Sequence, residues 1–119
     1  MKDIQTKEDI RCFVDSFYDK VNADAILSPV FNHHSKVNWE KHLPIMYDFW
    51  ASIILGSMEY KGQPFPKHAG LPVEKKHFEQ WVHLFTQTID DLFSGPVADM
   101  VKIRAVTIAS AFRYKMGIY

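Results

Sequence analysis

The sequence contains a single cysteine, Cys12, in a chain of 119 residues. One cysteine excludes an internal disulfide bond and any zinc site that is built from several cysteines. It also suits a reducing compartment, so we expect the protein in the cytoplasm. No histidine lies near Cys12 in the sequence and there is no G-x-S-x-G motif, so nothing indicates nucleophilic catalysis.

Neither sign of charge is in excess, because 14 Lys and Arg residues balance 14 Asp and Glu residues. Without a basic patch, the chain is not expected to bind nucleic acid or a membrane surface. The longest apolar run, FWASIILG, is far shorter than a bilayer span, and the charged N-terminus is no signal peptide. The five glycines are scattered, which excludes a glycine-rich phosphate loop.

Strict apolar/polar alternation is also absent, and apolar residues instead recur at helical spacing. This pattern predicts one all-α domain over residues 1–119, with helices at 7–22, 38–56, 73–93 and 97–116. Thr6 can cap the first helix, with Asp9 three residues further on. The segment 26–38 is interrupted by Pro29, and one turn of helix followed by a loop is predicted there.

Pro44 lies inside the second predicted helix. It either kinks that helix or means that regular hydrogen bonding starts near His42. His42 itself begins an apolar stripe that continues through Met46, Phe49, Trp50 and Ile53. From this pattern alone, His42 is either a boundary histidine that bonds to a carbonyl group or to water, or one of the polar groups of a pocket.

The sequence has six histidines, which are His33, His34, His42, His68, His77 and His83. No two are spaced i, i+4, as a helical zinc pair requires. Glu74 and His77 form one Glu-x-x-His motif, but a di-iron bundle needs two, so such a centre is not expected. We expect His33, His34 and His77 at the solvated surface and His83 half-exposed.

Two further side chains place a polar group within an apolar stripe. These groups are the hydroxyl of Tyr18 and the indole N–H of Trp81. Together with His42 they put one polar group on each of three helix faces, which is typical of an apolar pocket with a few convergent donors. His68 lies between Pro64 and Pro66 on one side and Gly70 and Pro72 on the other, so its ring is aimed without a long helix. Such a histidine can be the axial ligand of a haem, and the alternative is a solvated loop histidine beside Lys67.

The chain resembles the truncated haemoglobins, and most of all their group III branch. The similarity covers nearly the whole chain and rests on the order and spacing of FYDKV (17–21), SPVFN (28–32), WEKH (39–42), FWASIILG (49–56), YKGQPFPKH (60–68) and FEQWVHLF (78–85). The glycine-glycine motifs of the other two groups are absent. The resemblance implies a shortened globin fold, a two-over-two helical sandwich around one haem b.

Residue by residue, the resemblance makes His68 the proximal ligand of the haem iron. It places Tyr18, His42, Met46 and Trp81 in the distal pocket, and Phe17, Phe31, Phe49, Trp50, Lys67 and His77 around the haem. Lys67 and His77 are candidate partners of the haem propionates.

Three functions follow as alternatives. The first is a monomeric haem protein that binds O2, NO and CO for O2/NO chemistry, for example as an NO dioxygenase served by a reductase; several distal donors slow the release of O2, which is unfavourable for oxygen transport. The second is a peroxidase-like enzyme whose Tyr, His and Trp help to break an O–O bond. The third is a haem-free helical interaction domain, which would be colourless.

Overall fold

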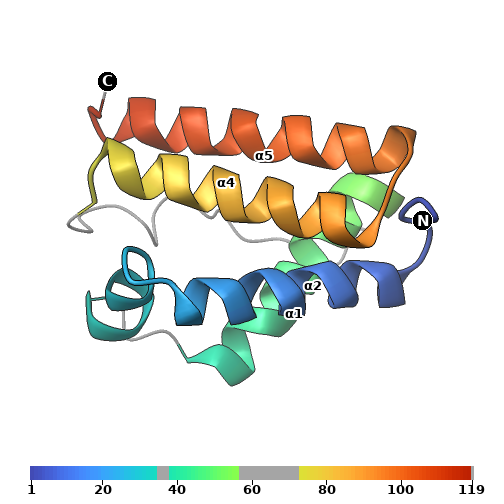
Figure 1. Cartoon of the computed structure of the whole chain (residues 1–119), viewed down its shortest axis with the longest axis horizontal. Coiled ribbons are helices and arrows are strands. Elements are labelled where there is room, and N and C mark those ends of the chain that lie inside the picture. Colours follow the sequence, from blue (N-terminus) through green and yellow to red (C-terminus); the bar gives the residue numbers. More distant parts are fainter. Residues whose placement is uncertain (35–37, 57–72, 119) are drawn as a thin grey trace.

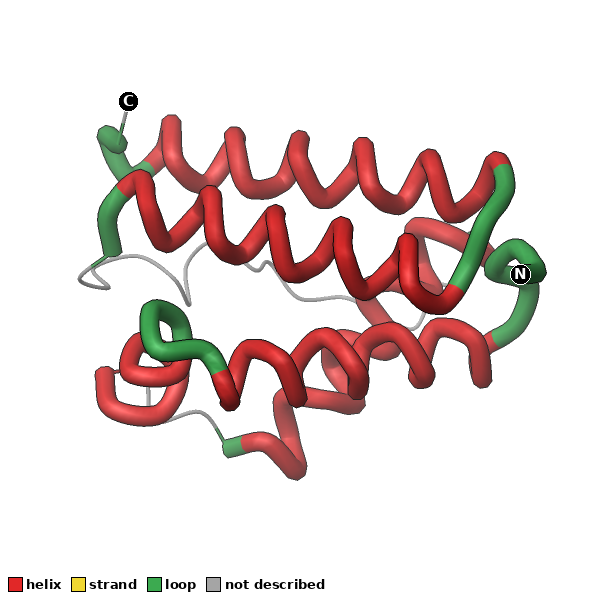
Figure 2. Tube along the Cα trace, in the orientation of Figure 1, coloured by secondary structure: helices red, strands yellow, loops and turns green. Residues whose placement is uncertain are grey.

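The described part of the chain folds into helices. The structure is a computed structural model that describes residues 1–34, 38–56 and 73–118. Its elements are α1 (Lys7–Ala23), the π-helix η1 (Pro29–His34), α2 (Trp39–Leu55), α4 (Lys75–Leu92) and α5 (Pro96–Lys115), and no strand occurs in these ranges (Figures 1 and 2). The all-α prediction is therefore confirmed.

The four predicted helices begin and end within two residues of their predicted bounds. The segment 26–38 differs from its prediction, because η1 forms six residues of π-helix where one turn and a loop were predicted. Pro29 is the first residue of η1, but helical bonding begins before it, since the backbone N–H of Ser28 donates to the carbonyl group of Asp24 at 3.0 Å. The proline therefore removes one helical donor without ending the helical segment.

The helices form two pairs, as expected for a two-over-two sandwich. α4 and α5 run antiparallel side by side, α1 runs below α4, and α2 crosses α1 obliquely (Figure 1). α1 packs on both α2 and α4, so it joins the two pairs. No helix in the described ranges is both long and apolar enough to cross a membrane.

The core is built around aromatic rings on the inner face of α1. Phe13 and Phe17 are fully buried, and Phe13 meets Trp50 of α2 and Phe85 of α4 edge to face, each at 5.9 Å between ring centroids. Trp50 and Phe85 stack on each other at 5.1 Å. Edge-to-face and stacked rings add to the gain from burial, so this contact fixes how α1, α2 and α4 lie against one another.

The first helix begins with a capping box. The backbone N–H of Asp9 donates to the hydroxyl of Thr6 at 3.1 Å, and the backbone N–H of Thr6 donates to the Asp9 carboxylate at 3.1 Å. Lys2 forms an ion pair with the same carboxylate at 2.8 Å. Desolvation acts to raise the pKa of Asp9, but Lys2 and the backbone N–H groups outweigh it and lower the pKa. The predicted cap is thus present.

The start of α5 is capped from the other end of the chain. Asp3 accepts hydrogen bonds from the backbone N–H groups of Val97 at 2.9 Å and Ala98 at 2.8 Å. Gly95 precedes the helix with a φ of +143°, and a Cβ there would come within 2.6 Å of the Asp3 carboxyl group. Only glycine allows the carboxylate to approach the helix so closely.

We predict that Asp3→Asn lowers the melting temperature at pH 7. Desolvation acts to raise the pKa of Asp3, but the backbone hydrogen bonds outweigh it and lower the pKa. A carboxyl group whose pKa is lower in the folded state stabilises the fold above its unfolded pKa of about 3.9. That contribution is lost as the pH falls through the folded pKa, so the wild type and the variant should converge in acid. Thermal unfolding from pH 2.5 to 7 measures this.

The matched control is Asp19→Asn. Asp19 is exposed on α1 and forms no hydrogen bond or ion pair within the described part of the chain. The Asp19→Asn variant should have the same melting curve as the wild type. An equal loss in both variants at neutral pH would show that Asp3 acts only through the net charge of the protein.

Candidate functional site

Tyr18 lies at the centre of a cluster of rings that come from three elements. Its ring meets Phe17 of α1 at 4.9 Å, Phe31 of η1 at 6.0 Å and, from α2, Trp39 at 5.3 Å and His42 at 5.2 Å. The side chain is buried, with 8% of its surface exposed. We call these five residues the Tyr18 cluster.

The hydroxyl of Tyr18 keeps its proton. Burial raises its pKa well above the ordinary value for a phenol, and desolvation is the one cause of the shift. A phenolate in this place would lose its hydration, which disfavours the charged form. Tyr18 is therefore a hydrogen-bond donor in apolar surroundings, where a donor interacts strongly with any acceptor that reaches it.

His42 is the polar member of the cluster on α2, and its half-buried ring also meets Trp39 edge-on at 5.5 Å. Its backbone N–H donates to the carbonyl group of Asn38 at 2.8 Å, which is the helical i to i−4 bond. Regular bonding therefore starts at His42, and α2 continues past Pro44 to Leu55. This outcome matches the second alternative for Pro44, whose exposed ring lies one turn beyond the helix start.

Trp81 reaches the Tyr18 cluster through a shared neighbour. Its half-buried indole lies edge-on to Phe17 at 5.5 Å and stacks on Phe85 at 5.5 Å. Phe17 thus touches both Tyr18 and Trp81. Of the three polar side chains singled out in the sequence, Tyr18 and His42 are in direct ring contact, and Trp81 is in ring contact with Phe17, which meets Tyr18.

α2 carries a broad apolar face that the rest of the described chain covers only in part. Trp50 and Ala51 are its only buried residues, and Phe49 lies edge-on to Trp50 at 5.3 Å. The partly buried apolar residues of α2 that pack on the core are Trp39, Leu43, Met46, Tyr47, Phe49, Ile53 and Ile54. Such a face, bordered by a phenol and an imidazole, can hold a flat and largely apolar group and donate hydrogen bonds to a small ligand.

Three of the predicted site residues remain to be placed. His68 and Lys67 lie outside the described residues. His77 is half-buried in the first turn of α4, and its Nδ1 accepts the backbone N–H of Glu74 at 2.8 Å, while Glu74 caps the helix in return. The Glu-x-x-His spacing therefore forms a helix cap, because i, i+3 spacing brings the two side chains to the same helix end.

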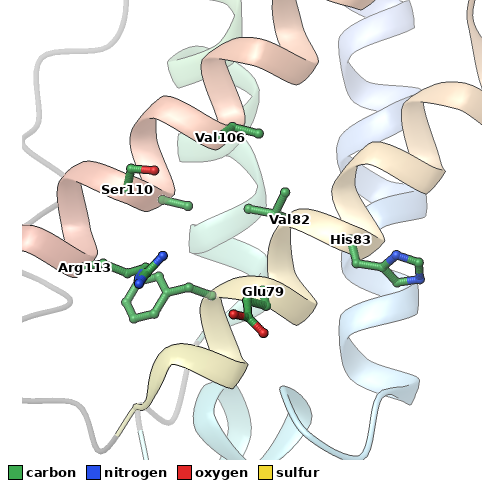
Figure 3. A pocket seen from close by; sticks show the side chains of 8 residues that line it. Glu79, Val82, His83, Val106, Ser110 and Arg113 are labelled. Carbon is green, nitrogen blue, oxygen red and sulfur yellow. The ribbon is translucent and has the colours of Figure 1, made fainter. Parts of the chain in front are cut away.

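A metal site does not arise elsewhere in the ranges that the structure covers, since no three His, Cys, Asp or Glu side chains gather there. A separate hollow of about 300 Å³ lies between α4 and α5 (Figure 3). It is lined by Phe78, Glu79, Val82, His83, Val106, Ala109, Ser110 and Arg113. None of these residues belongs to the Tyr18 cluster, so the hollow is distinct from it, and none was predicted as a pocket residue.

Sequence reasoning missed Trp39 and its partner Asn32. The indole N–H of Trp39 donates to the Asn32 side chain at 2.9 Å, and its ring stacks on Phe31 at 6.0 Å. One signal was available, because Trp39 lies three residues before His42 and so shares its helix face. The partner in η1 had no signal, since a contact between two elements leaves no periodic pattern.

A polar link fixes α2 on α1 beside the cluster. The hydroxyl of Tyr47 donates a short hydrogen bond to the Asp15 carboxylate, and the Arg11 guanidinium lies over the Tyr47 ring at 5.2 Å. Burial and the neighbouring carboxylate raise the pKa of Tyr47 to about 12, so the donor stays protonated at neutral pH. This link lies close in sequence to both Tyr18 and His42 and supports their contact.

Comparison with known proteins gives consistent matches along the chain. The sequence profile of the bacterial-like globins matches residues 2–111. The group 3 truncated haemoglobin Ctb of Campylobacter jejuni is 35% identical over 118 residues, which cover 93% of each chain. The crystal structure of the group III truncated haemoglobin from Campylobacter jejuni superimposes with a TM-score of 0.88 at 32% identity and covers 98% of this chain and 95% of that one.

We predict that Tyr47→Phe lowers the free energy of unfolding by about 1–2 kcal/mol, because it removes a hydrogen bond to a charged group. Chemical denaturation of Tyr47→Phe, Asp15→Ala and the double variant measures it. The double variant should lose less than the sum of the single variants, since both changes remove the same bond. Strictly additive losses would mean that the bond contributes nothing to the packing of α2 on α1.

Proposed function

Because the chain belongs to the bacterial-like globins and is a truncated haemoglobin most like those of group III, we propose that it binds haem b and uses it to hold O2 for reaction with NO. Family membership implies haem-based ligand binding. The finer assignment is supported by one observation above all, the protonated and buried Tyr18 beside His42. A pocket that holds O2 firmly suits chemistry on O2 better than its delivery.

The described residues fit such a group. A haem needs large apolar walls, and the half-covered apolar face of α2 with Met46 and Phe49 provides one. Phe31, stacked on Trp39, supplies further ring surface, and buried Trp50, stacked on Phe85, supports the face from the core. We propose His68 as the axial ligand, because prolines and a glycine flank it in the sequence and because it matches the family's proximal histidine. Lys67 and His77 are proposed as propionate partners.

When bound, ferrous haem supplies reversible binding of a diatomic gas and shifts electron density onto O2 more than onto CO. The residues of this chain then determine how long the gas stays. Tyr18 would donate a hydrogen bond from its hydroxyl to the polarised ligand, and the surrounding rings would exclude water that competes for the same bond. Trp81 supplies a second donor from α4, and His42 adjusts access from α2.

A peroxidase-like activity is the second candidate, favoured by the same set of donors. The two can be separated by substrate. Protein loaded with O2 should consume NO and form nitrate, whereas the peroxidase alternative requires H2O2 to oxidise a reducing dye at a comparable rate. We further propose that the protein acts as a cytoplasmic monomer, where exposed Cys12 stays reduced, and that a reductase or another electron donor serves it, since O2 binds only to ferrous haem.

We predict that His68→Ala yields mostly colourless protein, because its imidazole is the proposed protein ligand of the haem iron. Added imidazole should restore the Soret band. The measurement is haem content per chain by absorbance. His83→Ala is the matched control, since His83 is exposed on α4 and should stay haem-replete. Full haem content and an unchanged spectrum in His68→Ala would mean that a residue other than His68 ligates the haem iron.

We predict that Tyr18→Phe raises the O2 dissociation rate roughly tenfold, because a buried hydrogen bond is worth about 1–3 kcal/mol and about 1.4 kcal/mol is a factor of ten. CO dissociation should change far less, since CO takes up less charge. Trp81→Phe should act in the same direction, and the double variant need not be additive. Stopped-flow release of both gases measures this. Equal changes in the dissociation rates of O2 and CO would mean that Tyr18 and Trp81 only fill space in the pocket.

A further inference from the structure

Trp39 occupies the boundary between the Tyr18 cluster and the solvent. Its ring meets buried Tyr18 at 5.3 Å and half-buried His42 at 5.5 Å. Its indole N–H, in contrast, donates to Asn32, which is exposed. The ring therefore faces the cluster, and its polar edge faces outward.

A relay of two asparagines holds the indole in this place. The Asn32 side chain accepts from Trp39 at 2.9 Å and donates to the Asn22 side chain at 2.9 Å. The three residues come from α2, η1 and α1, so the relay connects all three elements that build the Tyr18 cluster. The stack of Trp39 on Phe31, at an angle of 24° between the ring planes, supports the same position.

We propose that Trp39 is a latch on the outer side of the proposed gas pocket, and that its bond to Asn32 sets how often the pocket opens to a diatomic ligand. The proposal rests on the proposed function and deepens it. With the latch closed, the indole shields the Tyr18 hydroxyl and the His42 ring from water. To open it, the ring must leave Phe31 and break the bond to Asn32.

The bonds in the relay suit a latch better than a permanent seal. Both are neutral, and both lie at exposed side chains, where water competes for the donors and acceptors. A single bond of this kind favours the closed state by roughly tenfold. Thermal motion therefore opens the latch often, while most molecules remain closed at any moment.

The test compares Asn32→Ala and Trp39→Phe with the wild type, as full-length, haem-loaded protein. Asn32→Ala removes the acceptor and leaves the tryptophan, whereas Trp39→Phe keeps an aromatic ring and removes the N–H. Each should speed CO association after flash photolysis by about three- to tenfold. The double variant should equal the single variants, because both remove one bond. Asn22→Ala, which removes only the outer bond, should have a smaller effect in the same direction.

A second measurement does not depend on gas binding kinetics. The three tryptophans give three indole N–H signals in the diamagnetic CO form, and hydrogen exchange of the Trp39 signal reports its bond directly. Asn32→Ala should speed that exchange and leave those of Trp50 and Trp81 unchanged. Asn38→Ala is the matched control, since Asn38 adjoins Trp39 and its side chain makes no capping bond to α2.

The outcomes separate the latch from the proposed function. Faster exchange together with faster CO association supports the latch. If haem is bound and Tyr18→Phe alters O2 release, but Asn32→Ala leaves CO association unchanged, the latch is overturned and the function stands. Equal effects of Asn38→Ala and Asn32→Ala would also overturn it. A protein that takes up no haem at all would overturn the proposed function instead.

Discussion

The edge-to-face packing of Phe13 on Trp50 of α2 and of Phe13 and Phe17 on Phe85 of α4 is the contact on which the remaining structure depends. Both phenylalanine rings are fully buried, and through them α1 joins its own pair to α4. Tyr18 follows Phe17 directly in the chain, so its hydroxyl is carried into apolar surroundings by the packing of its neighbour. The chemistry proposed for the site therefore follows from core packing, because the same burial that stabilises α1 also keeps the phenol protonated.

Much of the fold could be predicted from local patterns. Helical periodicity gave all four long helices, and the Thr6 and Asp9 pair indicated the start of α1, because a capping box acts within one turn. The π-helix after Pro29 could not be predicted in the same way, since a short segment has too few apolar residues to define a period. The Glu74 and His77 spacing shows a related limit, as one spacing serves both a metal site and a helix cap.

The candidate site was predictable where residues stand out within their own helix and unpredictable where the contact is between helices. Tyr18, His42 and Trp81 were found because each interrupts an apolar stripe. The Trp39 bond to Asn32 and the Tyr47 bond to Asp15 join separate elements, and no periodicity reports such pairs. These cross-element bonds are neutral or singly charged and few in number, so they adjust positions within a framework that the rings have already set.

The carboxylate that caps α5 also has a consequence for how the chain is made. Asp3 is synthesised before its partners Val97 and Ala98, which follow more than ninety residues later. The last long helix thus finds its cap waiting on a segment that has already emerged. A chain released before that helix is complete lacks the backbone N–H groups that hold Asp3, so the segment around Asp3 loses its anchor as well.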